Sequence, residues 1–268
     1  MSDKHMIFWD FDGTLGYRPG MWSRAVLDVL RARFPDRAVT LEDVRPFMRE
    51  RFPWHQPHLP HVEITAPEQW WIEIEQLLIR AYVGLGCSLA EASHLAPLAH
   101  QKYLEVSQWF LYEDVIPTLE TLRALGWEQA ILSNHIPELP DIVEALGLTP
   151  YVRAVFSSAL MGYEKPHPQA FLQALAVFDH PQTIWMIGDN IEADILGAQA
   201  VGIPAILVRQ EDSRATYVYP DLSLIPAFLS QQLASHKTVA IPNPLTQQSL
   251  FDQADLRLPS LADLSSER

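Results

Sequence analysis

The sequence predicts an α/β protein, with a parallel sheet as its core and an inserted, mainly helical second domain. Short apolar runs that end in polar residues recur along the chain, and helical patterns lie between them. One long stretch, residues 16–111, breaks this alternation and carries mostly helical patterns. Strands that alternate with helices favour a parallel sheet with right-handed crossovers, whose ligands bind at the carboxyl ends of the strands.

Four apolar runs are expected to form buried strands, because parallel strands covered on both faces read as continuous apolar segments. These runs are residues 6–10, 129–134, 183–189 and 203–209. Helices are expected to end at Gly126 and Gly147, which follow apolar residues at helical spacing. Three polar residues at strand ends, Asp10, Ser133 and Asp189, should therefore share one edge of the sheet.

The insert is expected to form a helical cap over the strand ends. Apolar residues at helical spacing predict one helix around Trp22 and another around Trp70, separated by a loop rich in proline and histidine. The core domain would comprise residues 1–15 and 112–235, the cap residues 16–111, and the C-terminal tail residues 236–268, docked or partly disordered. A cap that begins just after a strand-end carboxylate could close over a substrate and exclude water.

The composition narrows the class of protein. A chain of 268 residues with 48% hydrophobic content can form one large domain or a core with a smaller insert. The net charge of -14 disfavours nucleic acid as a partner. The first apolar run is too short for a signal peptide or a membrane span. With Cys87 as the single cysteine, no intramolecular disulfide can form, and we expect a cytoplasmic protein without a membrane partner.

Asp10 and Asp12 lie at the end of the first expected strand and are followed by Gly13. In a turn that glycine permits, the two carboxylates can diverge and flank one reacting phosphorus. One can attack while the other transfers protons, since a carboxylate nucleophile divides phosphoryl transfer into two easier steps. By itself the motif is also compatible with a plain Asp-Gly turn.

Two later elements offer groups for a phosphate. Ser133 and Asn134 end a strand, where a hydroxyl and backbone N–H groups can hold phosphoryl oxygens. Lys165 precedes Pro166, and a proline at a helix start would fix the backbone and hold the lysine ammonium in one direction. A helix N-cap serine and a solvated lysine are the alternatives for these two elements.

A fourth element, Asp189 and Asp194, can present oxygen atoms to one hard cation such as Mg²⁺. Aspartates in a turn and at a helix start are the alternative. All four elements occur in order, each at an expected strand end or helix start. Together they predict one phosphoryl-transfer site, in which a metal ion and a lysine offset the negative charge of the protein.

The four elements together resemble the haloacid dehalogenase superfamily of phosphohydrolases. The resemblance covers residues 1–15 and about 112–210, and residues 162–171 are similar to the subgroup that includes phosphoglycolate phosphatase, which has a helical cap after its first motif. It implies a Rossmann-like core and Mg²⁺-dependent hydrolysis of a small phosphorylated metabolite. Dehalogenases of the superfamily lack the second aspartate of the first motif, so the presence of Asp12 disfavours dehalogenation.

The resemblance also implies a role for each matching residue. Asp10 would be the nucleophile and a magnesium ligand, and Asp12 the general acid and then base, with its backbone carbonyl on the metal. The remaining residues would bind phosphate or magnesium: Ser133, the Asn134 amide and Lys165 the phosphate, Asp189 the metal, and Asp194 the metal directly or through water.

Other reactions on the same scaffold are a phosphosugar mutase and a phosphonate hydrolase. The latter uses a cap lysine in the family, and Lys102 is the single lysine of the insert, which weakens that hypothesis. A non-catalytic binding protein is disfavoured, because every chemically required side chain is present. Substrate selection is expected in the cap, where Arg18, Arg45, Arg49 and Arg51 are candidates for a second anionic group, or else solvated surface residues.

Overall fold

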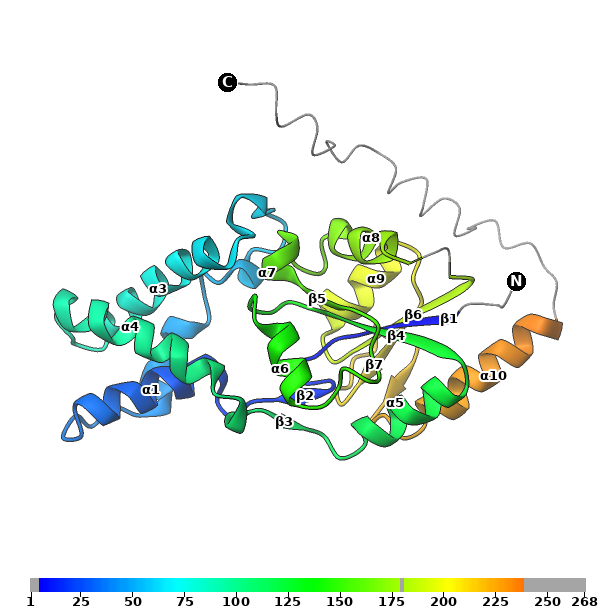
Figure 1. The fold of residues 1–268 in the computed structure, drawn as a ribbon, viewed down its shortest axis with the longest axis horizontal. Coiled ribbons are helices and arrows are strands. Elements are labelled where there is room, and N and C mark those ends of the chain that lie inside the picture. Colours follow the sequence, from blue (N-terminus) through cyan, green and yellow to red (C-terminus); the bar gives the residue numbers. More distant parts are fainter. Residues whose placement is uncertain (1–4, 179–180, 239–268) are drawn as a thin grey trace, which may run out of the picture.

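The computed structural model describes residues 5–178 and 181–238. At the centre of this part lies a six-stranded sheet in the order β5-β4-β1-β6-β7-β8, in which every pair is parallel (Figure 1). The strands are β1 (His5–Trp9), β4 (Trp127–Ser133), β5 (Val155–Ser157), β6 (Thr183–Gly188), β7 (Ala205–Val208) and β8 (Val218–Tyr219). The predicted α/β fold with a parallel sheet is confirmed, and all four predicted apolar runs contribute strands.

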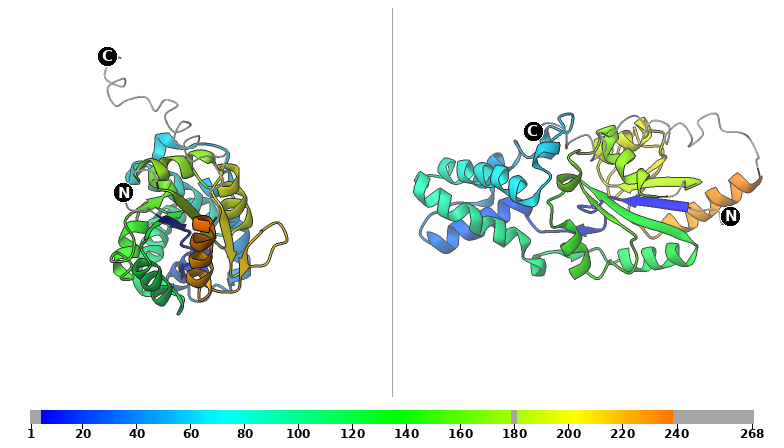
Figure 2. Two further views of the ribbon diagram at one scale, coloured as in Figure 1. Left: turned by 90° about the vertical axis from the view of Figure 1, so that its right-hand side faces the viewer. Right: turned by 45° about the horizontal axis from the view of Figure 1, so that its top comes forward.

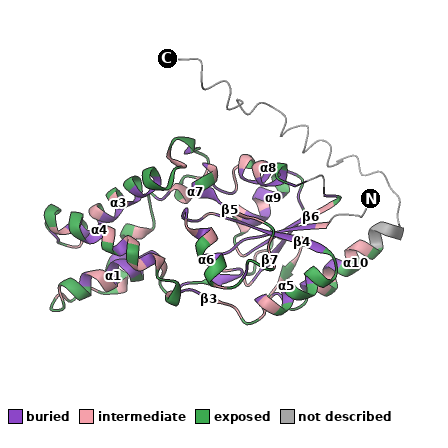
Figure 3. Ribbon diagram, viewed as in Figure 1, coloured by how far each residue is buried: buried purple, intermediate pink, exposed green. Residues whose placement is uncertain are grey.

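β1 lies in the middle of the sheet, between β4 and β6. Its last residue, Trp9, pairs with Ile131 of β4 and Ile187 of β6. Residues 6–9 are fully buried, because helices cover both faces of the sheet. This register brings the residues that follow β1, β4 and β6 to one edge of the sheet, and Figure 3 shows the central strands as mostly buried segments.

Helices pack on both faces of the sheet (Figure 2). One apolar core joins Ile7 and Trp9 to α5 (Val115–Ala124), α6 (Leu139–Ala145) and α10 (Ile225–Thr238). The other joins Met6 and Phe8 to α8 (Pro168–Ala176), the π-helix η5 (Ile191–Leu196) and α9 (Gly197–Ala200). A one-turn helix, α7 (Ser158–Met161), follows β5. Gly126 and Gly147 follow α5 and α6 with positive φ angles, so the predicted helix ends are confirmed.

The chain between β1 and α5 is mostly helical and lies beyond the carboxyl ends of the strands (Figure 1). Its helices are α1 (Met21–Arg33), α2 (Leu41–Val44), α3 (Pro67–Gly84) and α4 (Leu89–Leu104). Short 3₁₀ turns join them: η1 (Arg45–Met48), η2 (Pro53–His55), η3 (Val62–Ile64) and η4 (Val106–Gln108). Two short antiparallel strands, β2 (Gly16–Tyr17) and β3 (Phe110–Leu111), connect these helices to the sheet.

The predicted C-terminal tail, residues 236–268, lies outside the described residues except for its first three, which end α10. Within residues 5–178 and 181–238, no helix combines the length and the apolar composition needed to cross a membrane.

Candidate active site

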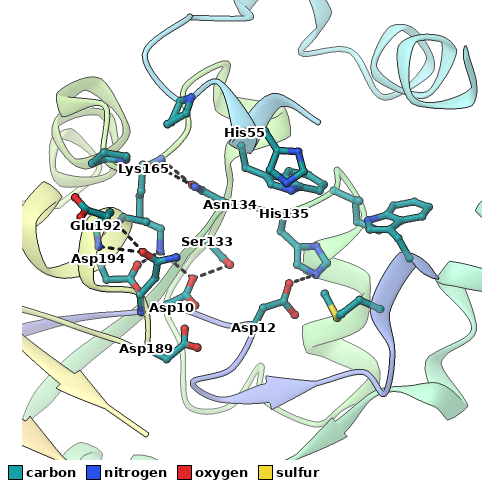
Figure 4. Close-up of a pocket in the computed structure, with 18 of the residues that line it drawn as sticks. Asp10, Asp12, His55, Ser133, Asn134, His135, Lys165, Asp189, Glu192 and Asp194 are labelled. Carbon is teal, nitrogen blue, oxygen red and sulfur yellow. Dashed lines mark hydrogen bonds and ion pairs between the residues drawn. The ribbon is translucent and has the colours of Figure 1, made fainter. Parts of the chain in front are cut away.

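All seven predicted site residues line one cavity of about 550 Å³ at the carboxyl edge of the sheet (Figure 4). They are Asp10, Asp12, Ser133, Asn134, Lys165, Asp189 and Asp194. Three strands supply most of them, because the parallel register places the ends of β1, β4 and β6 side by side. The loop before α8 supplies the lysine, and η5 supplies the last aspartate.

Asp10 is held by two donors on the same oxygen. Lys165 Nζ donates to Asp10 Oδ1 at 2.8 Å, and Ser133 Oγ donates to it at 2.9 Å. Oδ2 has no hydrogen-bond donor among the described residues. One oxygen of this carboxylate is therefore anchored, while the other is available to a ligand in the cavity.

Lys165 is buried, and its direction is fixed at both ends. Its Nζ also donates to Asp194 Oδ1 at 2.6 Å, and its backbone N–H and C=O bond to the Asn134 side chain at 2.7 and 2.8 Å. Burial lowers the pKa of Lys165, but the two carboxylates outweigh this effect and leave the pKa raised. The prediction that Pro166 begins the following helix is wrong, because α8 begins at Pro168. The Asn134 side chain, and not a helix start, orients the lysine.

Three carboxylates converge beside the lysine. Asp10, Asp189 and Asp194 each offer an oxygen, and these oxygens lie within 4.8 Å of one another. Burial raises the pKa of Asp189, and the charges of the other two carboxylates raise it further. Gly13 makes this approach possible, because a Cβ there would lie 2.2 Å from Asp189 Oδ2. Crowded carboxylates with a single ammonium group fit a divalent cation, which prefers oxygen ligands.

The Asp12 side chain points away from these carboxylates. Its Oδ2 lies 3.6 Å from His135 Nε2, and its Oδ1 is buried without a hydrogen-bond partner in the described part of the chain. Burial raises the pKa of Asp12 well above its usual range, and the charges of Asp10 and Asp189 add to this. This carboxyl group therefore binds a proton more readily than an ordinary aspartate. A metal contact through its backbone carbonyl stays a prediction.

His135 lies in the cavity and was not singled out from the sequence. It is buried against the rings of Phe11 and Trp109, with ring centroids at 5.7 and 5.3 Å, and burial lowers its pKa to about 3. Neither ring nitrogen has a hydrogen-bond partner among the residues that the structure describes. The sequence feature that could have identified it as a site residue is its position directly after Asn134, at a strand end. A neutral imidazole thus faces the Asp12 carboxyl group.

None of the four candidate arginines of the insert lines the cavity. Arg18 is buried behind the cavity wall and donates to the backbone carbonyls of Met21 and Lys102, both at 3.0 Å. Arg45 is exposed and pairs with Glu42. The expectation that these arginines hold a second anionic group of the substrate is therefore not supported by their positions.

Comparisons with known proteins agree with this geometry. A family model described as haloacid dehalogenase-like hydrolase matches residues 5–202. The bovine (Bos taurus) haloacid dehalogenase-like hydrolase domain-containing protein 3 is 33% identical over 144 residues, which cover 52% of this chain and 55% of that protein. The mouse (Mus musculus) protein of the same name is 26% identical over 253 residues, which cover 90% of this chain and 97% of that protein. The chain thus spans about half of the bovine relative and nearly all of the mouse one.

Solved structures show the same fold. A 2-haloacid dehalogenase from Pseudomonas syringae superimposes with a TM-score of 0.62 at 24% identity, over 85% of this chain and 99% of that one. A HAD phosphatase from Thermococcus onnurineus gives a TM-score of 0.56 at 20% identity, over 84% and 97% of the two chains. Because the family match covers most of the chain, this protein belongs to the haloacid dehalogenase-like hydrolases, as its motifs predicted.

Proposed function

We propose that this protein is a phosphatase that hydrolyses a small phosphomonoester through a phosphorylated Asp10, with Mg²⁺ as its metal. The observation that carries the proposal is the hydrogen bonding of the Asp10 carboxylate, whose two oxygens have different surroundings. Lys165 and Ser133 anchor one of its oxygens, and the other is free in the cavity, which Asp12, an acid of raised pKa, also lines. A fixed nucleophile next to a proton donor is what phosphoryl transfer through a covalent intermediate requires.

In the first half of the reaction, Asp10 Oδ2 attacks the phosphorus and the bond from phosphorus to the alcohol oxygen breaks. The Asp12 carboxyl group gives its proton to the leaving oxygen. Lys165, the Ser133 hydroxyl and the Asn134 backbone N–H would bind the phosphoryl oxygens and stabilise their charge. The raised pKa of Asp12 supports its role, because the group must be protonated before the leaving group departs.

In the second half, the ionised Asp12 accepts a proton from a water molecule that attacks the phosphorus of the aspartyl phosphate. The acyl phosphate bond breaks, inorganic phosphate leaves, and the Asp10 carboxylate is restored. Asp12 is then protonated again and ready for the next substrate. One residue can exchange the roles of acid and base because its two proton transfers run in opposite directions.

A divalent cation would be held by Asp10 and Asp189, with the Asp12 backbone carbonyl and, directly or through water, Asp194. When bound, such a cation neutralises charge on phosphoryl oxygens. The convergence of three carboxylates within 4.8 Å supports this assignment. In the proposed scheme the position of Asp194 also orients the ammonium group of Lys165.

We further propose that residues 16–111 form the cap and that residues 1–15 and 112–235 form the catalytic core. Contacts between the two parts support a cap that closes on the core. Trp71 Nε1 of α3 donates to Glu138 Oε1 at 2.7 Å, and His61 N donates to the Gly162 carbonyl at 2.9 Å. Closure of this kind would exclude water from the first half-reaction.

The relatives support a phosphatase over the alternative reactions. Similar proteins are named phosphoserine phosphatase in Thermus thermophilus (32% identity over 145 residues) and phosphoglycolate phosphatase in Aquifex aeolicus (27% over 128). A phosphonate hydrolase is disfavoured, because Lys102 pairs with Glu105 at 2.7 Å and does not line the cavity. A small phosphorylated metabolite in the cytoplasm is the partner that we propose.

Hydrolysis of p-nitrophenyl phosphate by the purified protein tests this function. We expect activity with Mg²⁺, loss of activity in excess chelator, and recovery when Mg²⁺ is restored. Asp10→Asn should abolish turnover, whereas the matched variant Asp141→Asn, on the exposed face of α6, should retain it. Full activity in excess chelator would overturn the metal assignment, and an active Asp10→Asn variant would overturn the nucleophile.

A further inference from the structure

The cavity has two different sides. The core side carries the carboxylates and Lys165, and the opposite side is built by the insert. Figure 4 shows His55 of the insert on the Asp12 side of the cavity, away from Asp189 and Asp194. The residues that the insert contributes form what we call the cap wall: Met21, Trp22, Ser23, Met48, Trp54, His55, Pro57 and Tyr103. Since Asp12 would protonate the leaving group, the alcohol part of the substrate must lie on this side.

Most side chains of the cap wall are apolar or aromatic, and stacked rings hold them in place. The Trp22 and Tyr103 rings are parallel within 3°, with centroids 3.7 Å apart. Phe52 stacks on Trp54 at 4.6 Å and packs against Trp22 at 5.4 Å. Trp22 and Tyr103 are almost fully buried, so their packing fixes the surface before a ligand binds. A preformed aromatic surface binds apolar groups at low entropic cost.

The cap wall has no cation to offer a substrate. Lys165 is the only lysine or arginine among the described residues that line the cavity, and Asp10 and Asp194 already engage it. His55 is the one histidine of the cap wall, and burial lowers its pKa, so its imidazole is neutral at neutral pH. A carboxylate or second phosphate on the alcohol part would lose its hydration here and gain no cationic partner among the described residues of the cap wall.

We infer, on the basis of the proposed function, that the substrate is a phosphomonoester whose alcohol part is uncharged and apolar and packs on the cap wall. This chemistry differs from that of phosphoserine and phosphoglycolate, the substrates in the names of two relatives, because each of them carries a carboxylate. The specificity of those relatives would therefore not transfer to this protein, although their sequences are similar to it.

Two comparisons among primary alkyl phosphates test the inference, because all of these esters release a primary alcohol. Along ethyl, propyl and butyl phosphate, kcat/KM should rise roughly fourfold for each methylene that packs on the cap wall. Butyl phosphate and its analogue with a terminal carboxylate form the matched pair for charge. We expect the carboxylate to lower kcat/KM about tenfold or more, because it has no cation to pair with.

Met48→Arg supplies the missing cation on the cap wall and should raise the activity ratio of the carboxylated ester to butyl phosphate about tenfold. Leu59→Arg is the matched control, because Leu59 is 50% exposed, lies in the insert and does not line the cavity. Three results would overturn the inference and leave the proposed phosphatase function intact. They are a kcat/KM that does not change from ethyl to butyl phosphate, a preference of the parent protein for the carboxylated ester, and an unchanged activity ratio in Met48→Arg. No hydrolysis of any phosphate ester, p-nitrophenyl phosphate included, would overturn the proposed function and this inference with it.

Discussion

Glu164, which directly precedes Lys165, allows a test of how burial changes the pKa of an acid and the pH dependence of stability. Its side chain is fully buried, and neither carboxyl oxygen has a hydrogen-bond donor in the described part of the chain. The nearest ionisable group of the insert is His61, whose Nε2 lies 3.5 Å from Oε1. Burial raises the pKa of Glu164 to about 8, and burial lowers the pKa of His61. At neutral pH the pair is therefore a neutral acid beside a neutral imidazole.

The raised pKa of Glu164 makes stability depend on pH in a defined direction. Between the ordinary glutamate pKa of 4.5 and about 8, the folded state holds a proton that the unfolded chain releases. The free energy of unfolding then falls by about 1.4 kcal/mol for each pH unit in this window, and by at most about 5 kcal/mol in total. The stabilisation is complete below the lower limit and lost as the pH rises to the upper one.

Glu164→Gln removes this titration and keeps the shape of the side chain. We expect the free energy of unfolding of the parent to fall relative to that of the variant as the pH rises from about 5 to about 8. Contributions of other buried carboxyls, such as Asp12 and Asp189, cancel in the difference. Urea unfolding followed by tryptophan fluorescence and by circular dichroism measures it, and coincident curves establish a two-state transition. Glu144→Gln, on the exposed face of α6, is the matched control. A constant difference between parent and Glu164→Gln across this range would refute the reasoning.

Two further predictions concern the geometry of the site. Gly13→Ala places a Cβ 2.2 Å from Asp189 Oδ2, so half-maximal activity should need about ten times as much Mg²⁺ or more. Gly147→Ala is the control, because Gly147 has a similar positive φ and nothing lies within 4 Å of the added Cβ. It should cost about 1 kcal/mol of stability and leave the Mg²⁺ requirement unchanged. Equal Mg²⁺ requirements in the two variants would contradict the role given to Gly13. Asn134→Ala removes both hydrogen bonds to the Lys165 backbone and should lower kcat about tenfold or more, and a parental kcat would show that Asn134 does not orient the lysine.

The strands and the site elements could be predicted from the sequence because each leaves a local pattern. Residues 6–9 form a continuous apolar run, since β1 is covered on both faces. Asp10, Ser133 and Asp189 follow such runs, and the parallel register then brings them together without further information. β5 and β8, with 3 and 2 residues, are too short to leave a pattern.

The cap wall and the buried acid could not be predicted, because they depend on contacts between segments that are distant in the chain. Trp22 and Tyr103 stack only because α1 packs against α4. Glu164 is buried by a loop of the insert about a hundred residues away, and an isolated glutamate in a loop reads as a solvated residue. Lys165 was predicted as a site residue, but the contact that orients it was not, because that contact comes from the side chain of Asn134, 31 residues earlier in the chain.

The central claim, a phosphoryl group carried by Asp10, can be measured on the protein itself. Asp12→Asn retains the nucleophile and lacks the base, so with p-nitrophenyl phosphate and Mg²⁺ it should accumulate the aspartyl phosphate. After an acid quench, intact mass spectrometry should show one added phosphoryl group, and peptide mapping should place it on Asp10. The double variant with Asp10→Asn should show none. A phosphoryl group on another side chain, or turnover by Asp10→Asn near the parental rate, would contradict the covalent mechanism.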